Sequence, residues 1–197
     1  MQRFKLKTDI IFGQNALEAL KSVQGKNVVV FTDRFLTDNG TANRIKELLT
    51  SCENVSIYSD VIPDPPVETV ASGLKFLIEN EIDLVVAVGG GSAIDAAKGM
   101  QLYYEQPDID IDALKTKFMD IRKRTYKVPE LKKTKLVAIP TTSGTGSEVT
   151  SFAVITDKEK NIKYPLADYE LTPDIAIIDP DLVMTVPKNV TADTGMD

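Results

Sequence analysis

The sequence predicts an α/β fold, a Rossmann-like open parallel sheet with helices on both faces, and three observations lead to it. Short apolar runs such as 28–31 and 84–88 alternate along the chain with helical stretches. Continuous apolar runs of this length are typical of parallel strands buried on both faces. Two of the runs end in loops rich in Gly, Ser and Thr, at 89–92 and 140–148. Repeated strand and helix units favour a parallel sheet because right-handed crossovers place helices on both of its faces.

The first 80 residues alternate between strand and helix patterns. Strands are predicted at 4–12, 28–31 and 55–58, and helices at 16–23, 42–49 and 67–78. Residues 4–12 alternate only weakly between polar and apolar side chains, so they fit either an edge strand or the opening of a hairpin. The run 28–31 is β-branched and aromatic, which is typical of a buried strand, and the polar pair Thr32-Asp33 ends it.

The rest of the chain continues this alternation after one interruption. Strands are predicted at 84–88, 135–139, 152–156 and 175–178, a helix at 93–100 and a turn at 157–161. Residues 104–133 are rich in Asp and then in Lys, and we interpret them as a helical excursion at the surface. We find no internal repeat and no low-complexity linker.

The composition is that of a folded globular protein. Hydrophobic residues make up 43% and charged residues 26% of the 197 residues, which are ordinary values. A net charge of −6 argues against a general nucleic-acid-binding protein, because neutralising phosphates requires a basic face. One basic cluster is interpreted as a solvated helix face, with an anion or partner site as the alternative. Its members are Lys115, Lys117, Arg122, Lys123, Arg124 and Lys127.

The compartment is predicted to be cytoplasmic. Cys52 is the only cysteine and cannot form an internal disulfide, and the first residues lack the apolar core of a signal peptide. No apolar stretch approaches the roughly 20 residues that span a bilayer. We therefore expect no membrane insertion.

The first glycine-rich loop predicts a site for a pyrophosphate. Gly89, Gly90 and Gly91 let main-chain N–H groups approach an anion without an intervening Cβ, and Ser92 opens a helix whose positive end points toward it. The loop is not a GxGxxG fingerprint, since positions 93 and 94 are Ala and Ile. The alternative is a tight turn from strand to helix that binds no ligand.

Three further features favour a dinucleotide. Asp33 follows the first buried strand at the end where ligands lie in open α/β sheets, so its carboxylate could accept hydrogen bonds from a ribose. It would repel a 2′-phosphate, which favours NAD over NADP; alternatively Asp33 only caps the next helix. The loop 140–148 carries more hydroxyls than a turn requires. Lys163 could add positive charge near a phosphate or ribose, or be an isolated surface lysine.

Four blocks of sequence together resemble the iron-containing (group III) alcohol dehydrogenase family. They are GGGSAIDAAK at 89–98, PTTSGTGSEVTSFAVITD at 140–157, KYPLADYELTPDIAIIDP at 163–180 and TADTGMD at 191–197. The segment around FMDIRKRTYK is similar to the alcohol dehydrogenase half of bifunctional aldehyde-alcohol dehydrogenases. The closing block also resembles the propanol dehydrogenases of bacterial microcompartments. The resemblance spans the whole chain.

The resemblance implies a dehydroquinate synthase-like N-terminal domain for NAD, followed by a helical C-terminal domain that supplies most of a metal site. We expect residues 1–182 to form the NAD-binding domain and 183–197 to begin the helical domain, the rest of which is absent. Position 152 departs from relatives that have a polar residue there. By motif, the implied cofactor contacts are Asp33, Asp64, Gly90, Gly91, Ser92, Thr141, Thr142, Thr145, Thr150, Phe152, Val154, Lys163 and Leu182.

The resemblance also implies Fe²⁺ held by one aspartate and three histidines, with the first pair spaced Asp-x-x-x-His on one helical face. Asp197 matches that aspartate, but the chain contains no histidine. We therefore expect an NAD(H)- and iron-dependent enzyme that interconverts short primary alcohols and aldehydes as a homo-oligomer, in the cytoplasm or a microcompartment. This chain alone is expected to be inactive.

Two alternatives stay open from the sequence. One is a non-catalytic nucleotide-binding or assembly module, which fits the missing histidines. The other is a relative of the same fold with different chemistry, such as a zinc glycerol dehydrogenase or dehydroquinate synthase. The loop 140–148 argues against this second alternative, because it resembles the alcohol dehydrogenase branch more closely.

Overall fold

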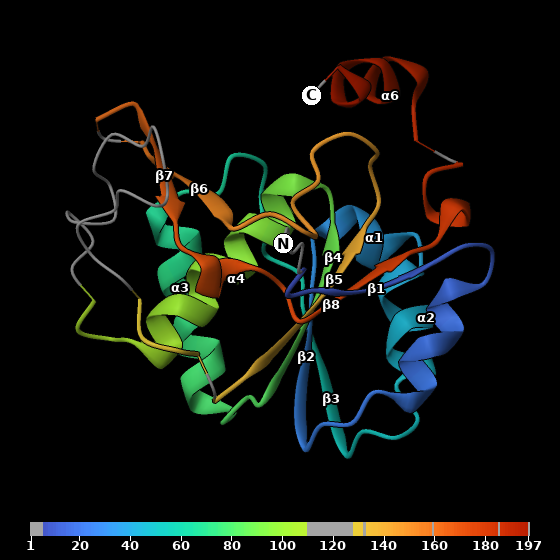
Figure 1. Cartoon of the computed structure of the whole chain (residues 1–197), viewed down its shortest axis with the longest axis horizontal. Coiled ribbons are helices and arrows are strands. Elements are labelled where there is room, and N and C mark those ends of the chain that lie inside the picture. Colours follow the sequence, from blue (N-terminus) through green and yellow to red (C-terminus); the bar gives the residue numbers. More distant parts are fainter. Residues whose placement is uncertain (1–5, 110–127, 132, 159, 185, 197) are drawn as a thin grey trace, which may run out of the picture.

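The computed structural model describes residues 6–109, 128–131, 133–158, 160–184 and 186–196, and its centre is a six-stranded parallel sheet (Figure 1). The strand order is β1-β8-β5-β4-β2-β3. The strands are β1 (Asp9–Phe12), β2 (Asn27–Phe31), β3 (Asn54–Tyr58), β4 (Leu84–Gly89), β5 (Lys135–Pro140) and β8 (Ile175–Ile178). Every pair in this sheet is parallel, so the predicted α/β fold with an open parallel sheet is confirmed.

Helices cover both faces of the sheet, as predicted (Figure 1). The helical segments are η1 (Ala16–Ser22), α1 (Arg34–Asp38), α2 (Thr41–Leu48), α3 (Val67–Glu79), α4 (Gly91–Glu105), η3 (Tyr169–Leu171), η4 (Pro180–Leu182) and α6 (Lys188–Gly195). Two apolar clusters fill the two interfaces. Alternate residues of β2 divide between them: Val29 joins the cluster under α3 and α4, and Val28 joins the one under η1 and α2.

A second, two-stranded sheet lies outside the main one. β6 (Phe152–Asp157) and β7 (Ile162–Ala167) form an antiparallel hairpin, which confirms the predicted strand at 152–156 and the turn that follows it. β7 itself was not predicted, because only its C-terminal residues are buried and Pro165 interrupts its pattern. The hairpin packs beside α4 and α3 (Figure 1).

Several elements differ from the prediction. β1 pairs in parallel with β8 as an edge strand, so the hairpin alternative for residues 4–12 is wrong. The helix predicted at 16–23 is a 3-10 helix. α1 was not predicted, because it has only five residues. α6 lies within 183–197, where the resemblance implied the start of a helical domain, but its bounds were not predicted because it buries none of its side chains. The basic cluster lies within 110–127, outside the described residues, and so does most of the excursion at 104–133.

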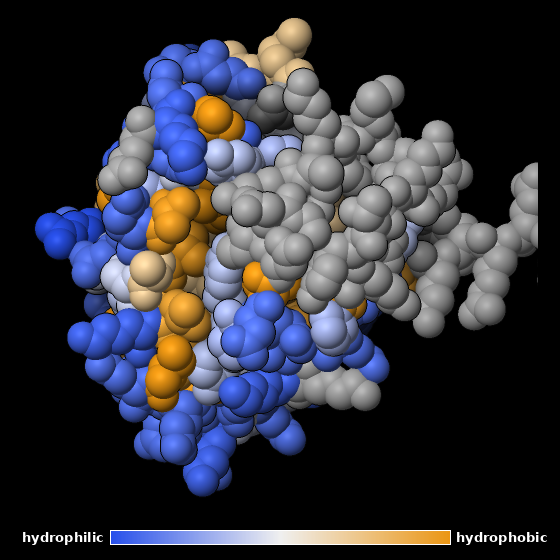
Figure 2. All heavy atoms as spheres, turned by 90° about the vertical axis from the view of Figure 1, so that its left-hand side faces the viewer, coloured by the Kyte–Doolittle hydropathy of each residue, from blue (hydrophilic) through white to orange (hydrophobic). Residues whose placement is uncertain are grey.

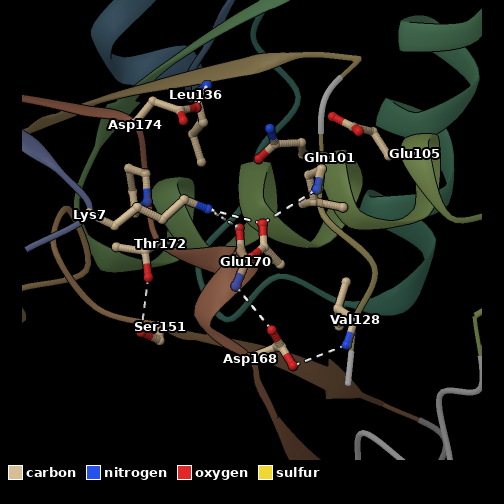
Figure 3. Close-up of polar contacts among 12 residues, drawn as sticks. Lys7, Gln101, Glu105, Val128, Leu136, Ser151, Asp168, Glu170, Thr172 and Asp174 are labelled. Carbon is tan, nitrogen blue, oxygen red and sulfur yellow. Dashed lines mark hydrogen bonds and ion pairs between the residues drawn. The ribbon is translucent and has the colours of Figure 1, made fainter. Parts of the chain in front are cut away.

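Carboxylates tie the loops around β8 to their neighbours (Figure 3). Asp168 is fully buried and accepts hydrogen bonds from the N–H groups of Val128 (3.1 Å) and Glu170 (3.0 Å). Glu170 in turn pairs with Lys7 at 3.2 Å. Asp174 accepts a hydrogen bond of 2.8 Å from the N–H of Leu136. These bonds satisfy main-chain donors that the sheet leaves free.

The face formed by α3 and the hairpin carries exposed apolar side chains. Figure 2 shows this side of the molecule, where a band of apolar residues crosses the surface. The large exposed apolar residues of α3 and the hairpin are Val67, Ile78, Val154 and Ile162. None of the helices in the described part of the chain has the length and hydrophobicity that crossing a bilayer requires.

Candidate functional site

A cleft of about 650 Å³ lies where the carboxyl ends of β2, β4 and β5 meet. Parallel strands direct these ends, and the loops that follow them, to the same edge of the sheet. The cleft falls within the size range of ligand sites, which is about 300 to 1,000 Å³. Eight of the predicted cofactor contacts line it: Asp33, Gly90, Gly91, Ser92, Thr141, Thr142, Thr145 and Leu182.

The glycine-rich loop brings main-chain N–H groups to the floor of the cleft. Gly89 has φ +150°, and a Cβ there would lie 2.6 Å from the Cβ of Ala93. A Cβ on Gly91 would lie 3.1 Å from Ser147 Oγ, so the second loop closes directly over this position. α4 starts at Gly91 and runs for 15 residues with its N-terminus at the cleft. The arrangement suits a phosphate group.

The second loop contributes hydroxyls directly beside the glycine-rich loop. Thr141 is held against the first loop by a hydrogen bond of 3.0 Å from its N–H to the carbonyl of Gly89. Thr142 Oγ1 is buried and has no hydrogen-bond partner among the described residues. A buried polar atom without a partner is costly, and a ligand bound beside Gly90 would satisfy it.

Asp33 combines the two roles that the sequence left open. Its carboxylate accepts a hydrogen bond of 2.9 Å from the N–H of Leu36 and so caps α1. The same side chain lines the cleft. One oxygen of the carboxylate serves the cap, which leaves acceptor capacity for a ligand.

Asp64 and Lys163 lie together where the loop after β3 meets β7, and neither lines the cleft. Their side chains form an ion pair of 2.6 Å, and both are more than half exposed. The N–H of Asp64 also donates a hydrogen bond of 3.3 Å to Ser92 Oγ. Asp64 has φ +50°, a conformation that costs a non-glycine residue energy and that clusters at functional loops.

Five predicted contacts do not line the cleft: Asp64, Lys163, Thr150, Phe152 and Val154. The last three lie where the second loop leads into β6. Their main-chain atoms instead contact two charged residues of α4 that were not predicted. Lys98 is fully buried and donates to the carbonyls of Thr150 (2.9 Å) and Phe152 (2.7 Å). Asp95 accepts a hydrogen bond of 3.0 Å from the N–H of Val154. GGGSAIDAAK contains both residues, but its periodicity reveals no function for them.

Burial shifts the pKa values of both charged residues. Desolvation lowers the pKa of Lys98 to about 8, against the opposing effects of Asp95 and Glu148. Desolvation likewise raises the pKa of Asp95, although Lys98 and the N–H of Val154 favour its ionised form. Asp95 Oδ1 lies 4.0 Å from Lys98 Nζ. The two groups therefore form a buried pair in which burial outweighs attraction.

The wall opposite the glycine loop was missed by the sequence analysis. α6 contributes Val190 and Thr194 to the cleft, and Phe35 and Arg44 line the other end. In Figure 1, α6 (red) lies above the carboxyl ends of the strands. A Cβ on Gly144 would overlap the carbonyl oxygen of Thr194, so the second loop and α6 are in direct contact. No motif or periodicity in the sequence indicates this contact.

The predicted metal ligand lies outside the described residues, since Asp197 is not among them. Within the part of the chain that the structure covers, no group of three or more His, Cys, Asp or Glu side chains could hold a metal ion.

The chain that forms this cleft matches a known protein family. The family described as "Iron-containing alcohol dehydrogenase" matches residues 7–180. The chain is 50% identical to an aldehyde-alcohol dehydrogenase of Streptococcus pneumoniae over 202 residues, which cover 100% of the chain and 23% of that protein. It is 44% identical to an NADPH-dependent butanol dehydrogenase of Clostridium saccharobutylicum over 200 residues, which cover 100% of the chain and 50% of that protein.

Solved structures agree with this match. An iron-containing alcohol dehydrogenase from Thermococcus thioreducens superposes with a TM-score of 0.88 at 33% identity, covering 99% of this chain and 51% of that one. A sulfoacetaldehyde reductase from Bifidobacterium kashiwanohense in complex with NAD⁺ gives a TM-score of 0.84 at 30% identity, covering 100% and 51%. The chain thus spans about a quarter to a half of the length of these proteins. It belongs to the iron-containing alcohol dehydrogenase family.

Proposed function

We propose that the cleft binds a nicotinamide dinucleotide and that the chain is the cofactor-binding domain, residues 1–182, of an alcohol dehydrogenase. The observation that carries the proposal is the convergence of two loops on one cleft: the loop at the N-terminus of α4 and the loop 140–148. The sulfoacetaldehyde reductase of the same fold is a complex with NAD⁺, which supports this assignment. The following residues, 183–197, would begin a helical domain.

The residues of the cleft fit such a cofactor. Main-chain N–H groups of Gly90 and Gly91 would hold the pyrophosphate, together with the positive end of α4. Thr142 Oγ1, which lacks a partner among the described residues, would gain one. Leu182, Val186 and Val190 would exclude water from one side. A bound nicotinamide would supply or accept a hydride at its C4, for reaction with a short primary alcohol or aldehyde.

The carboxylate of Asp33 supports NAD rather than NADP. A 2′-phosphate placed beside it would be repelled at neutral pH. The related butanol dehydrogenase is named as NADPH-dependent, so the family match by itself does not select the coenzyme. The preference therefore depends on this residue and its surroundings.

The residues of this chain do not supply the metal site that the family name implies. The sequence has no histidine, and Asp197 alone cannot hold an ion. We expect the purified 197-residue chain to oxidise no NADH with acetaldehyde or propionaldehyde, with or without added Fe²⁺. A cytoplasmic location and homo-oligomerisation stay predictions from the sequence.

Calorimetric titration of NADH and NADPH into the purified chain tests the proposal. We expect saturable binding with a preference for NADH. In Asp33→Asn the cap is kept, since Asn caps helices as well as Asp, but the charge is lost. This change should move the ratio of the two affinities toward NADPH by roughly tenfold, a change of about 1.4 kcal/mol.

The matched control is Asp38→Asn, which removes an exposed carboxylate of the same helix outside the cleft. It should leave both affinities unchanged. Failure of the chain to bind either nucleotide would contradict the proposed function. An unchanged affinity ratio in Asp33→Asn would contradict the role of Asp33 only.

A further inference from the structure

Lys98 is a buried charge that the proposed function does not use. Its relative exposure is 0%, although it lies on α4 only seven positions after Gly91, the first residue of that helix. Burying an ammonium group costs the fold energy unless the group is fully bonded. A methionine or leucine would fill the same space without this cost. Lys98 lies on the helix whose N-terminus opens at the cleft, but its side chain does not line the cleft.

The ammonium group of Lys98 is fully occupied by protein oxygens. It donates hydrogen bonds to the carbonyl of Thr150 (2.9 Å), the hydroxyl Oγ1 of Thr150 (3.2 Å) and the carbonyl of Phe152 (2.7 Å). An ammonium group has three protons, and three acceptors use them all. Lys98 thus has no donor left for a ligand, which excludes direct binding or proton transfer by its side chain.

The bonded segment is the end of the second cleft loop. Thr150 follows the hydroxyl-rich residues 141–148, and Phe152 is the first residue of β6. Asp95 acts on the same junction, since it accepts a hydrogen bond from the N–H of Val154 (3.0 Å). Ser92 Oγ accepts one from the N–H of Asp64 (3.3 Å), in the loop after β3. Ser92, Asp95 and Lys98 recur every three residues, so one side of α4 holds the surrounding loops.

We propose that Lys98 is a positioning residue for nucleotide binding: it fixes the main chain at Thr150 and Phe152, and thereby sets the position of loop 141–148 against the glycine loop. The proposal rests on the proposed function of the cleft. It assigns to Lys98 an effect on affinity that acts entirely through the loop, because its side chain does not line the cleft.

The protonation of Lys98 separates positioning from simple stabilisation. Burial lowers its pKa to about 8, and the charged groups that face it are Asp95 on α4 and Glu148 in the loop. Above this pH the neutral amine has two protons for three acceptors, so the loop is held less firmly and NADH affinity should fall. The free energy of unfolding should change in the opposite direction, because the neutral form is cheaper to bury. A residue that merely stabilised the fold would move both quantities together.

The test measures NADH affinity and the free energy of unfolding from pH 7 to 9 in the wild-type chain, Lys98→Met and Lys75→Met. We expect the wild type to lose affinity above pH 8, and Lys98→Met to bind NADH roughly ten- to hundredfold more weakly at pH 7, as expected when buried acceptors lose their donors. The NADH affinity of Lys98→Met should not fall further as the pH passes 8. Lys75→Met removes an exposed lysine of α3 and should behave as the wild type.

Hydrogen exchange at the amides of Thr150 and Phe152 provides a readout without nucleotide, and it should accelerate in Lys98→Met. Wild-type-like affinity and exchange in a folded Lys98→Met would overturn the proposal while leaving the proposed function intact. If this variant does not fold, the wild-type pH profile decides: affinity that is constant or rises from pH 7 to 9 overturns the inference. Absence of NADH binding by the wild type at every pH overturns both.

Discussion

Glycine is required at Gly144 because the opposite wall of the cleft occupies the space of a side chain. A Cβ there would overlap the carbonyl oxygen of Thr194, and φ is +130°. The overlap with Thr194 and the positive φ each exclude other residues, but only the overlap involves the wall of the cleft. Among single positions, this one links the hydroxyl-rich loop to α6 most directly.

We predict that Gly144→Ala displaces α6 from the loop. The main-chain strain at positive φ costs about 1 kcal/mol of unfolding free energy. The overlap with Thr194 should in addition weaken NADH binding, since α6 lines the cleft. Denaturant unfolding and calorimetric titration measure the two effects.

Gly13→Ala is the control for main-chain strain alone. Gly13 has φ +123°, and a Cβ there has nothing within 4 Å. The Gly13→Ala change should destabilise the chain without affecting NADH affinity. Equal affinities in the two variants would show that the contact between Gly144 and α6 does not shape the site.

The crossing of α3 and α4 depends on a small residue between the two helices. Gly73 is buried on α3, and a Cβ there would overlap Met100 Sδ and lie 2.8 Å from Phe31 Cζ. The close approach aligns α4 over the sheet, and α4 carries the glycine loop at one end. Packing between the elements therefore positions a loop that is far from the contact.

We expect Gly73→Ala to be destabilising even though alanine is the better helix former. Overpacking of a filled core costs about 1 to 3 kcal/mol, which equals or exceeds the helix-propensity gain of roughly 1 kcal/mol. Thermal or denaturant unfolding tests this. In Gly195→Ala, where a Cβ has nothing within 4 Å, the free energy of unfolding should be unchanged or slightly higher. A more stable Gly73→Ala variant would mean that Met100 moves aside without cost.

At the scale of the whole molecule, the buried charge of Lys98 opposes folding at neutral pH. The pKa of Lys98 falls from 10.5 to about 8 on burial. Because the folded pKa is the lower one, the unfolded chain binds the proton more tightly. The free-energy cost of burying the charge is fully present below pH 8 and disappears as the pH rises toward 10.5. The chain is therefore more stable at higher pH, because this cost is lost.

We predict that the free energy of unfolding of the wild type rises relative to that of Lys98→Met between pH 8 and 9. The full pKa shift of Lys98 corresponds to on the order of 3 kcal/mol in the free energy of unfolding, and the interval from pH 8 to 9 shows a part of it. Burial raises the pKa of Cys52, which has the opposite effect on stability, but both proteins share it. Denaturant titrations at each pH measure the difference. A difference independent of pH would contradict a lowered pKa for Lys98.

Much of the architecture could be derived from the residues in order. Apolar runs at 28–31, 84–88 and 135–139 became adjacent strands of one sheet, because a continuous apolar run reports burial on both faces whatever its partners are. The glycine-rich loops were located for a similar reason: positive φ and close main-chain approach restrict the residue type at the position itself.

Long-range contacts decided the rest. The pairing of β6 with β7 in a separate sheet, the contact of α6 with Gly144 and the burial of Lys98 are set by segments distant in the sequence. A lysine in a helix has the same local pattern whether it faces water or two carbonyl groups. Its energy and its pKa depend on which loops pack over it, and that is defined only once the chain has folded.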